Sequence, residues 1–172
     1  MVASQTSQLA KLGPREAILA MLRCPDSQGS GGSQNWNAPI EGKTRIVKEL
    51  FLMSVETGSG PESLTFPFTP GPYGPSSFDL TNVLDSMIRT GEISAVPLPS
   101  GRGVMLRLYG RTGAEAEAVW SRLSPKLQQD LIKIKSRFNA TPYKMLLYRV
   151  YKSYPEFTTN SLIRDEILSE QQ

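Results

Sequence analysis

The sequence SSFDLTNVLDSMIRTGEISAVPLPSGRGVMLRLY, residues 76–109, predicts an amphipathic helix followed at once by a β-hairpin. Ser76 or Ser77 can cap this helix and Gly91 can end it. Its apolar residues recur at the spacing of one helical face: Leu80, Val83, Leu84, Met87 and Ile88. The runs ISAVPL and VMLRLY then flank the turn sequence PSGRG, and Pro97 favours an edge strand. We therefore expect a helix with a wing behind it.

Two further helices are predicted before this stretch. The first begins near Pro14 and ends at Cys24-Pro25. The second, KTRIVKELFLMSVET from Lys43, has the pattern of an amphipathic helix whose basic residues lie near its start. Its apolar stripe contains Ile46, Val47, Leu50, Phe51 and Ser54, and its basic residues are Lys43, Arg45 and Lys48.

Two long connections separate these helices. Residues 25–41 are rich in Gly, Ser and Asn and show no periodicity, which is typical of a flexible surface loop. Trp36 within this loop either folds back onto the core or stays exposed. Residues 57–75 contain prolines and glycines that prevent a regular helix, although LTFPF could run extended along the core.

The chain after Gly110 is helical again. Helices are expected over residues 112–123, from Pro125 to Phe138 and from Pro142 to Tyr154, with a last polar helix over residues 160–168. The predicted fold class is α+β, mostly α. A winged-helix-like core with a β-hairpin wing spans residues 1–111, and a helical subdomain at 112–172 packs on it to form a single compact unit.

The composition excludes several classes of function. The chain has no histidine and one cysteine, so neither a His- or Cys-based metal site nor a Ser-His or Cys-His dyad can form within it. No phosphate-loop or dinucleotide-binding motif is present. We expect no enzyme activity, cofactor or metal. Cys24 has no partner for an internal disulfide, and a buried, inert thiol is its expected state. No run of apolar residues could span a bilayer, which predicts a cytoplasmic protein without a membrane partner.

The positive charge is concentrated in one part of the chain. Residues 89–155 hold twelve basic and four acidic residues, a net +8, whereas residues 1–88 carry −2 and residues 156–172 carry −3. Such asymmetry is typical of a site for an anionic partner, although solvated helix faces also collect basic residues. The lysines and arginines of the C-terminal helices could form a ridge that contacts a nucleic-acid backbone, or could only solvate two amphipathic surfaces: Lys126, Lys133, Lys135, Arg137, Lys144, Arg149 and Lys152. The candidate nucleic-acid-binding residues are Arg89, Arg102, Arg107, Arg111, Lys133 and Arg137.

The third helix is poorly equipped to read DNA. In a winged-helix DNA reader this helix enters the major groove, and its exposed face should carry basic and amide side chains. Here that face contains Asp79, Asn82, Asp85, Ser86 and Arg89, so carboxylates would approach phosphates at a cost in affinity. The wing is better supplied with positive charge, since Arg102 lies at its tip.

Two motifs carry a family resemblance. The run GKTRIVKELFL at residues 42–52, followed by YGPSSFDL at 73–80 and the hairpin, resembles the YwgA-like family of uncharacterised prokaryotic proteins. It is distantly similar to Panacea-type and SocA-type antitoxin and adaptor domains. In the second motif we expect Tyr73 to pack beneath the start of the helix and Gly74-Pro75 to fix the turn. An aromatic residue often stands in the family where this chain has Ser76.

Two hypotheses for function follow. The leading one is a non-enzymatic winged-helix-like regulator that binds nucleic acid through its wing and basic C-terminal helices, with a homodimer compatible with this role. The alternative, which the resemblance implies, is an antitoxin-like or adaptor module that binds a protein client.

Overall fold

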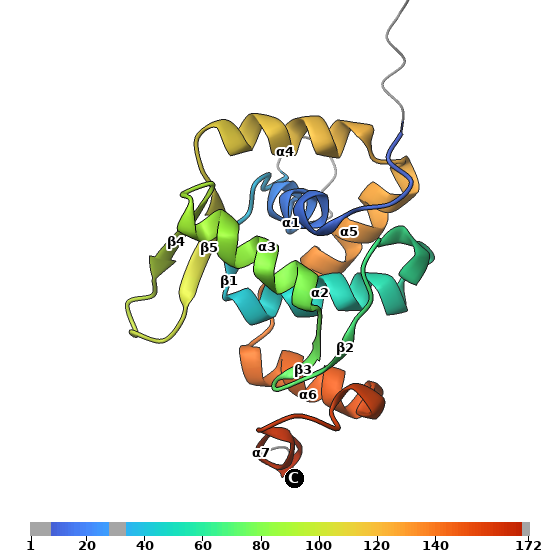
Figure 1. Ribbon diagram of the computed structural model, residues 1–172, viewed down its shortest axis with the longest axis vertical. Coiled ribbons are helices and arrows are strands. Elements are labelled where there is room, and N and C mark those ends of the chain that lie inside the picture. Colours follow the sequence, from blue (N-terminus) through green and yellow to red (C-terminus); the bar gives the residue numbers. More distant parts are fainter. Residues whose placement is uncertain (1–7, 28–33, 170–172) are drawn as a thin grey trace, which may run out of the picture.

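The computed structural model describes residues 8–27 and 34–169 and has an α+β, mostly helical architecture (Figure 1). The long helices are α1 (Pro14–Arg23), α2 (Lys43–Glu56), α3 (Phe78–Arg89), α4 (Arg111–Arg122), α5 (Pro125–Phe138) and α6 (Tyr143–Ser153). The shorter helical elements are α7 (Arg164–Ser169) and the 3₁₀ turns η1 (Pro61–Ser63) and η2 (Pro155–Phe157). The strands are β1 (Ile40–Glu41), β2 (Thr69–Gly71), β3 (Gly74–Ser76), β4 (Ile93–Pro97) and β5 (Val104–Leu108).

The first half of the chain has a winged-helix arrangement. Its elements follow the order α1, β1, α2, α3, β4, β5, and the three strands form an antiparallel sheet in the order β1-β5-β4. Leu106 lies at the centre of this sheet, opposite Ile40 on one neighbour and Ala95 on the other. The sheet places β4 at an edge and Pro97 at its last position, as predicted. The β4–β5 wing extends to one side of the helices (Figure 1).

The expected loop at residues 25–41 ends in a strand, so that expectation is wrong at its C-terminal end. Ile40 and Glu41 pair with β5, which adds a third strand to the predicted hairpin. Trp36 folds back onto the core and packs edge-to-face on Trp120, with a ring separation of 5.7 Å and 38% of its surface exposed. Residues 28–33 of this predicted loop lie outside the described residues.

Helix α3 forms as its sequence predicts. The Ser77 hydroxyl accepts a hydrogen bond from the Leu80 backbone N–H, which satisfies a donor in the first turn. The helix ends at Arg89, and Gly91 follows with a φ of 78°, a conformation that glycine adopts without strain. Leu80, Leu84 and Met87 bury the predicted apolar face.

Helix α2 lies at the centre of the molecule. The sequence predicted an amphipathic helix with a polar side, and this expectation is wrong over residues 45–54. Residues 45–54 are all buried, including Arg45, Lys48 and Glu49. The helix is enclosed because α1, α3, α5, β1, β3 and η1 all pack against it. Amphipathic periodicity predicts that the charged residues face solvent, but these neighbours leave the middle of the helix, residues 45–54, without a solvent-exposed face.

The connection between α2 and α3 contains the short elements η1, β2 and β3, which the prediction of an irregular segment at residues 57–75 did not include. Gly74 has a φ of 90°, and a Cβ atom built there would lie 2.7 Å from Cε1 of Tyr151. The Lys48 ammonium donates to the Pro75 carbonyl at 2.9 Å. Gly74 and Pro75, which begin β3 directly after the Pro72–Tyr73 turn, are therefore fixed against α2 and α6.

The predicted C-terminal helices are present, and they surround the winged core. Helix α4 packs across α1, α5 packs against α2, and α6 contacts β3 (Figure 1). Helix α7 begins at Arg164, later than the predicted residue 160. The preceding residues are held by other contacts, since Leu162 N–H donates to the Pro72 carbonyl and the Ser161 and Tyr151 hydroxyls lie 2.7 Å apart.

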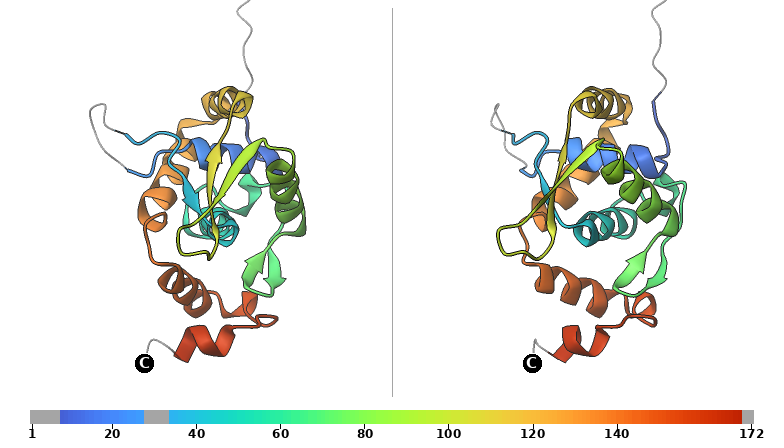
Figure 2. Two further views of the ribbon diagram at one scale, coloured as in Figure 1. Left: turned by 90° about the vertical axis from the view of Figure 1, so that its left-hand side faces the viewer. Right: turned by 60° about the vertical axis from the view of Figure 1, so that its left-hand side comes forward.

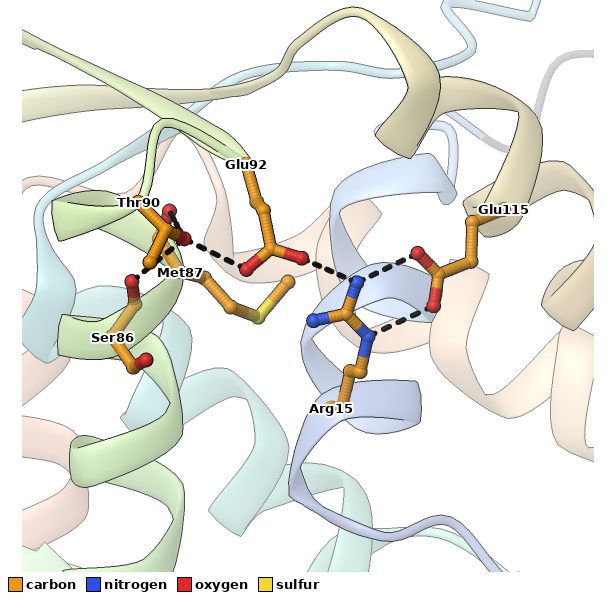
Figure 3. Close-up of polar contacts among 6 residues, drawn as sticks. All are labelled: Arg15, Ser86, Met87, Thr90, Glu92 and Glu115. Atoms are coloured by element: carbon orange, nitrogen blue, oxygen red, sulfur yellow. Dashed lines mark hydrogen bonds and ion pairs between the residues drawn. The ribbon is translucent and has the colours of Figure 1, made fainter.

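An arginine joins the base of the wing to α1 and α4 (Figure 3). Arg15 on α1 contacts both carboxylate oxygens of Glu115 on α4 and one oxygen of Glu92, just before β4, at 2.7–2.8 Å. Thr90 holds the other Glu92 oxygen at 2.8 Å. Hydrogen bonds and charge from Arg15 lower the pKa values of both carboxyls. This cluster fixes the start of the wing relative to the helices.

Among the helices of the described residues, none is both long and apolar enough to cross a membrane.

Candidate nucleic-acid interface

The six candidate residues from the sequence are all exposed, and they are spread over five parts of the fold. Arg102 lies in the β4–β5 loop, and the other five lie on α3, β5, α4 and α5: Arg89, Arg107, Arg111, Lys133 and Arg137. In the described part of the chain, none of the six forms an ion pair with a carboxylate.

The elements that carry these residues surround the wing. Seen from the wing side, α5 and α3 lie on opposite flanks, α4 lies above and α6 lies below the wing tip (Figure 2, left). The positive charge of residues 89–155 is therefore divided among several surfaces rather than gathered on one helix face.

Two of the C-terminal basic residues cannot belong to a surface ridge. Lys135 is fully buried, and its ammonium donates to the carbonyls of Met21, Cys24 and Ala38 at 2.6, 2.6 and 2.8 Å. It satisfies carbonyls left unpaired where α1 ends, at the negative end of the helix dipole. Arg149 is bound to both carboxylate oxygens of Glu56, at 2.7 and 2.9 Å.

A cavity of about 570 Å³ opens beside the tip of the wing, between the β4–β5 loop and the first turns of α2 and α6. Basic side chains from all three elements line this wing cavity: Lys43, Arg45, Arg102 and Lys144. Glu41 is the one carboxylate among the described residues that line it. Of these four residues, the sequence named Arg102 as a candidate and included Lys144 only in the possible C-terminal ridge. It did not single out Lys43 and Arg45 as binding residues, because they belong to α2, which is far from the other two in the sequence.

Two helix starts face the wing cavity. The residue before α2 is Gly42 and the residue before α6 is Pro142, and neither provides a side chain that caps its helix. Helix N-termini carry partial positive charge and backbone N–H groups that attract anions. The first turns of both helices contain no acidic residue. The helix dipoles therefore add to the charge of the basic side chains.

Hydrogen bonds hold the buried cation of the cavity in place. Arg45, only 4% exposed, donates from Nη1 to the Phe138 carbonyl at 2.7 Å and from Nε to the Glu41 carbonyl at 3.2 Å. Lys43 at the rim forms an exposed ion pair with Asp85 of α3 at 3.0 Å. With Glu41 and Asp85 set against four cations, the formal charge of the site is about +2.

A second, smaller hollow of about 250 Å³ lies between α2, the β2–β3 turn and α3, and we call it the hairpin hollow. Val47, Pro72 and Leu84 give it an apolar lining, and Lys48 contributes the aliphatic stem of a buried side chain. Tyr73 lines this hollow with 48% of its surface exposed. The expectation that Tyr73 packs beneath the helix start is therefore wrong, since the turn directs the residue outward.

The core contains further ionisable groups, whose pKa values are shifted by burial. Burial lowers the pKa of Lys48 to about 7 and that of Lys135 to about 8, because it penalises the ammonium form. Burial raises the pKa of Glu49 to about 8. Cys24 is buried, as predicted, and burial raises the pKa of its thiol. None of these four lies on an exposed surface.

Across residues 8–27 and 34–169, no three Asp, Glu or Cys side chains come together where they could hold a metal ion. Comparison with protein-family models, with curated proteins and with solved structures finds no match to this chain.

Proposed function

We propose that this chain is a non-enzymatic, winged-helix-like regulatory module that binds nucleic acid beside the tip of its wing. The observation that carries the proposal is the wing cavity, where Lys43, Arg45, Arg102 and Lys144 meet around two uncapped helix starts. Phosphates are bound by Lys and Arg side chains and by helix N-termini, and both are present here. The sequence predicted a binding surface on the wing and the basic C-terminal helices; we now place it at the wing cavity, and Arg102 belongs to both.

A polyanion fits this cavity better than a small organic acid does. The cavity opens beside the exposed wing tip, so a strand of phosphates that enters it could continue along the wing, where Arg107 on β5 is also exposed. The proposal places the protein in the cytoplasm, where nucleic acid is accessible and Cys24 stays reduced.

The test is the binding of fluorescein-labelled random-sequence oligonucleotides, single-stranded and duplex, measured by fluorescence anisotropy between 50 and 200 mM salt (about the range over which phosphate contacts are lost). Arg102→Ala should weaken binding several-fold and reduce the salt slope by about one. Arg164→Ala removes an exposed arginine of α7 that does not line the wing cavity, and it should bind like the parent chain. Absence of salt-dependent binding to both oligonucleotides, or an equal loss in the two variants, would overturn the proposal.

The second candidate function is an antitoxin-like or adaptor module that binds a protein client. It is favoured by apolar side chains at the wing: Val96 on edge strand β4 is 54% exposed, and Tyr109 beyond β5 is 66% exposed. An extended segment of a client could pair with the free edge of β4. A tagged chain should then recover a stoichiometric protein partner, and Val96→Arg should lose it. Recovery that is unaffected by Val96→Arg would count against binding at this edge.

A further inference from the structure

The wing cavity and the hairpin hollow are neighbours with complementary chemistry. Lys43 and Thr44 line both, so the two hollows meet at the first turn of α2. The wing cavity is rich in cations, whereas the hairpin hollow has an apolar lining with Ser76 and Thr81 as polar groups. A nucleotide combines the same two chemistries, an anionic phosphate and a flat, largely apolar base with a polar edge.

Two tyrosines border this pair of hollows. Tyr73 lies in the turn between β2 and β3 and is 48% exposed, and Tyr143 is the first residue of α6 and is 42% exposed. Tyr143 and Thr44 both line the wing cavity, which places the Tyr143 ring beside the start of α2. Half-exposed aromatic rings beside a basic groove are typical of sites where unpaired bases stack.

The neighbouring helix disfavours duplex DNA. The exposed face of α3 carries Asp79, and Asp85 on the same helix is paired with Lys43. A duplex with α3 in its major groove would bring its phosphates close to these carboxylates. Bases of a duplex are also stacked and paired, so they cannot enter a hollow between protein elements. A single strand can place its bases and its phosphates in separate sites.

We propose that the joined hollows bind single-stranded nucleic acid, with a base in the hairpin hollow against Tyr73, the adjoining phosphate in the wing cavity, and Tyr143 as a second stacking surface. This inference rests on the proposed function, because it assigns the strandedness of the nucleic acid bound at the same site.

The experiment compares a labelled 15-nucleotide single strand of random sequence with its duplex, again by fluorescence anisotropy. The single strand should bind about tenfold more tightly than the duplex or better. Tyr73→Ala and Tyr143→Ala should each weaken binding of the single strand by about tenfold, the effect of one lost stacking contact. Phenylalanine at either position keeps the ring and should retain most of the affinity. Tyr109→Ala is the matched control, since Tyr109 is 66% exposed and lines neither hollow.

The outcomes separate this inference from the proposed function. Tighter binding of the duplex, with the loss in Arg102→Ala retained, would overturn the single-strand inference and leave the proposed function standing. Unchanged binding in folded Tyr73→Ala and Tyr143→Ala proteins, checked by circular dichroism, would overturn the role of stacking. Failure of both oligonucleotides to bind would overturn the proposed function, and the inference with it.

Discussion

Replacing Glu49 with glutamine should remove a loss of stability that we expect in the parent chain between pH 4.5 and pH 7. Glu49 is fully buried in α2, and within the described structure neither of its carboxylate oxygens has a hydrogen-bond partner. Burial raises its pKa from 4.5 to about 8, although Lys135 on α5 and Arg45 on α2 oppose this shift and Asp26 adds to it. The folded state therefore holds this carboxyl protonated at neutral pH.

The sign and size of the effect follow from proton linkage. Between pH 4.5 and about 8 the folded chain keeps a proton on Glu49 that the unfolded chain has lost, so the free energy of unfolding falls as pH rises. Each pH unit in this window costs about 1.4 kcal/mol, which amounts to about 3 kcal/mol between pH 4.5 and pH 7. Glutamine is similar in shape and loses no proton. The variant should match the parent chain near pH 4.5 and exceed its stability by about 3 kcal/mol at pH 7.

Urea unfolding followed by circular dichroism at half-unit steps of pH measures this difference. The window ends at pH 7 because the folded chain begins to lose the Lys48 proton there, which offsets the effect of Glu49 up to about pH 8. Above about pH 8 the unfolded chain retains protons on Lys48 and Lys135 that the folded chain has lost, so these two groups raise stability. Glu117→Gln, on the exposed face of α4, is the control and should follow the parent chain. A Glu49→Gln variant that also follows the parent chain would refute the assignment of a buried, protonated carboxyl.

Three other substitutions test the packing that positions the site. Lys135→Met should lower the free energy of unfolding by about 3–5 kcal/mol in urea titrations, because it leaves the buried carbonyls around the end of α1 without a donor. A loss of stability below about 1 kcal/mol would contradict this role. Gly74→Ala should destabilise the fold by about 2 kcal/mol or more, since its φ of 90° and its contact with Tyr151 both disfavour a side chain. Gly113→Ala on α4 is the control and should not destabilise the fold, because a Cβ atom there would meet nothing within 4 Å. Arg15→Met removes the ion pair with Glu115, and it should lower the thermal midpoint by about 2–4 °C at low salt. The shift should be smaller at 1 M salt, where the Debye length is about 3 Å. A shift that does not depend on salt would argue against an electrostatic role of this pair.

Features set by local sequence could be predicted. The cap at Ser77, the end of α3 before Gly91 and the turn between β4 and β5 each depend on a few consecutive residues. The same holds for the helix starts at Pro125 and Tyr143. These positions follow from conformational preferences that do not change with the surrounding structure.

Features set by distant contacts could not be predicted. Strand β1 contains only two residues, and no local sequence pattern marks it. It forms because these residues pair with distant residues of β5 such as Leu106. The burial of Glu49 and Lys135 depends on which helices surround α2, and a solvent-exposed position was the reasonable expectation for both. The wing cavity has the same origin, since its lining comes from three separated segments. The sequence contained only a weak indication of an anion site there. Gly42 and Pro142 each precede a helix without a capping side chain, and a lysine follows each of them within two residues.

The strength of an ion pair determines whether its cation can leave a carboxylate and bind a phosphate instead. The pair between Lys43 and Asp85 is exposed on both sides, with 52% and 45% of the side-chain surfaces accessible. Such a pair contributes at most about 1 kcal/mol, so a phosphate in the wing cavity can take Lys43 from Asp85 at little cost. The Arg149–Glu56 pair is more enclosed, with Glu56 only 15% accessible and bound through both oxygens, so Arg149 stays structural. Positive charge near the wing is thus available from Arg102 and Lys43, while Lys135 and Arg149 of the C-terminal helices are committed to holding the fold.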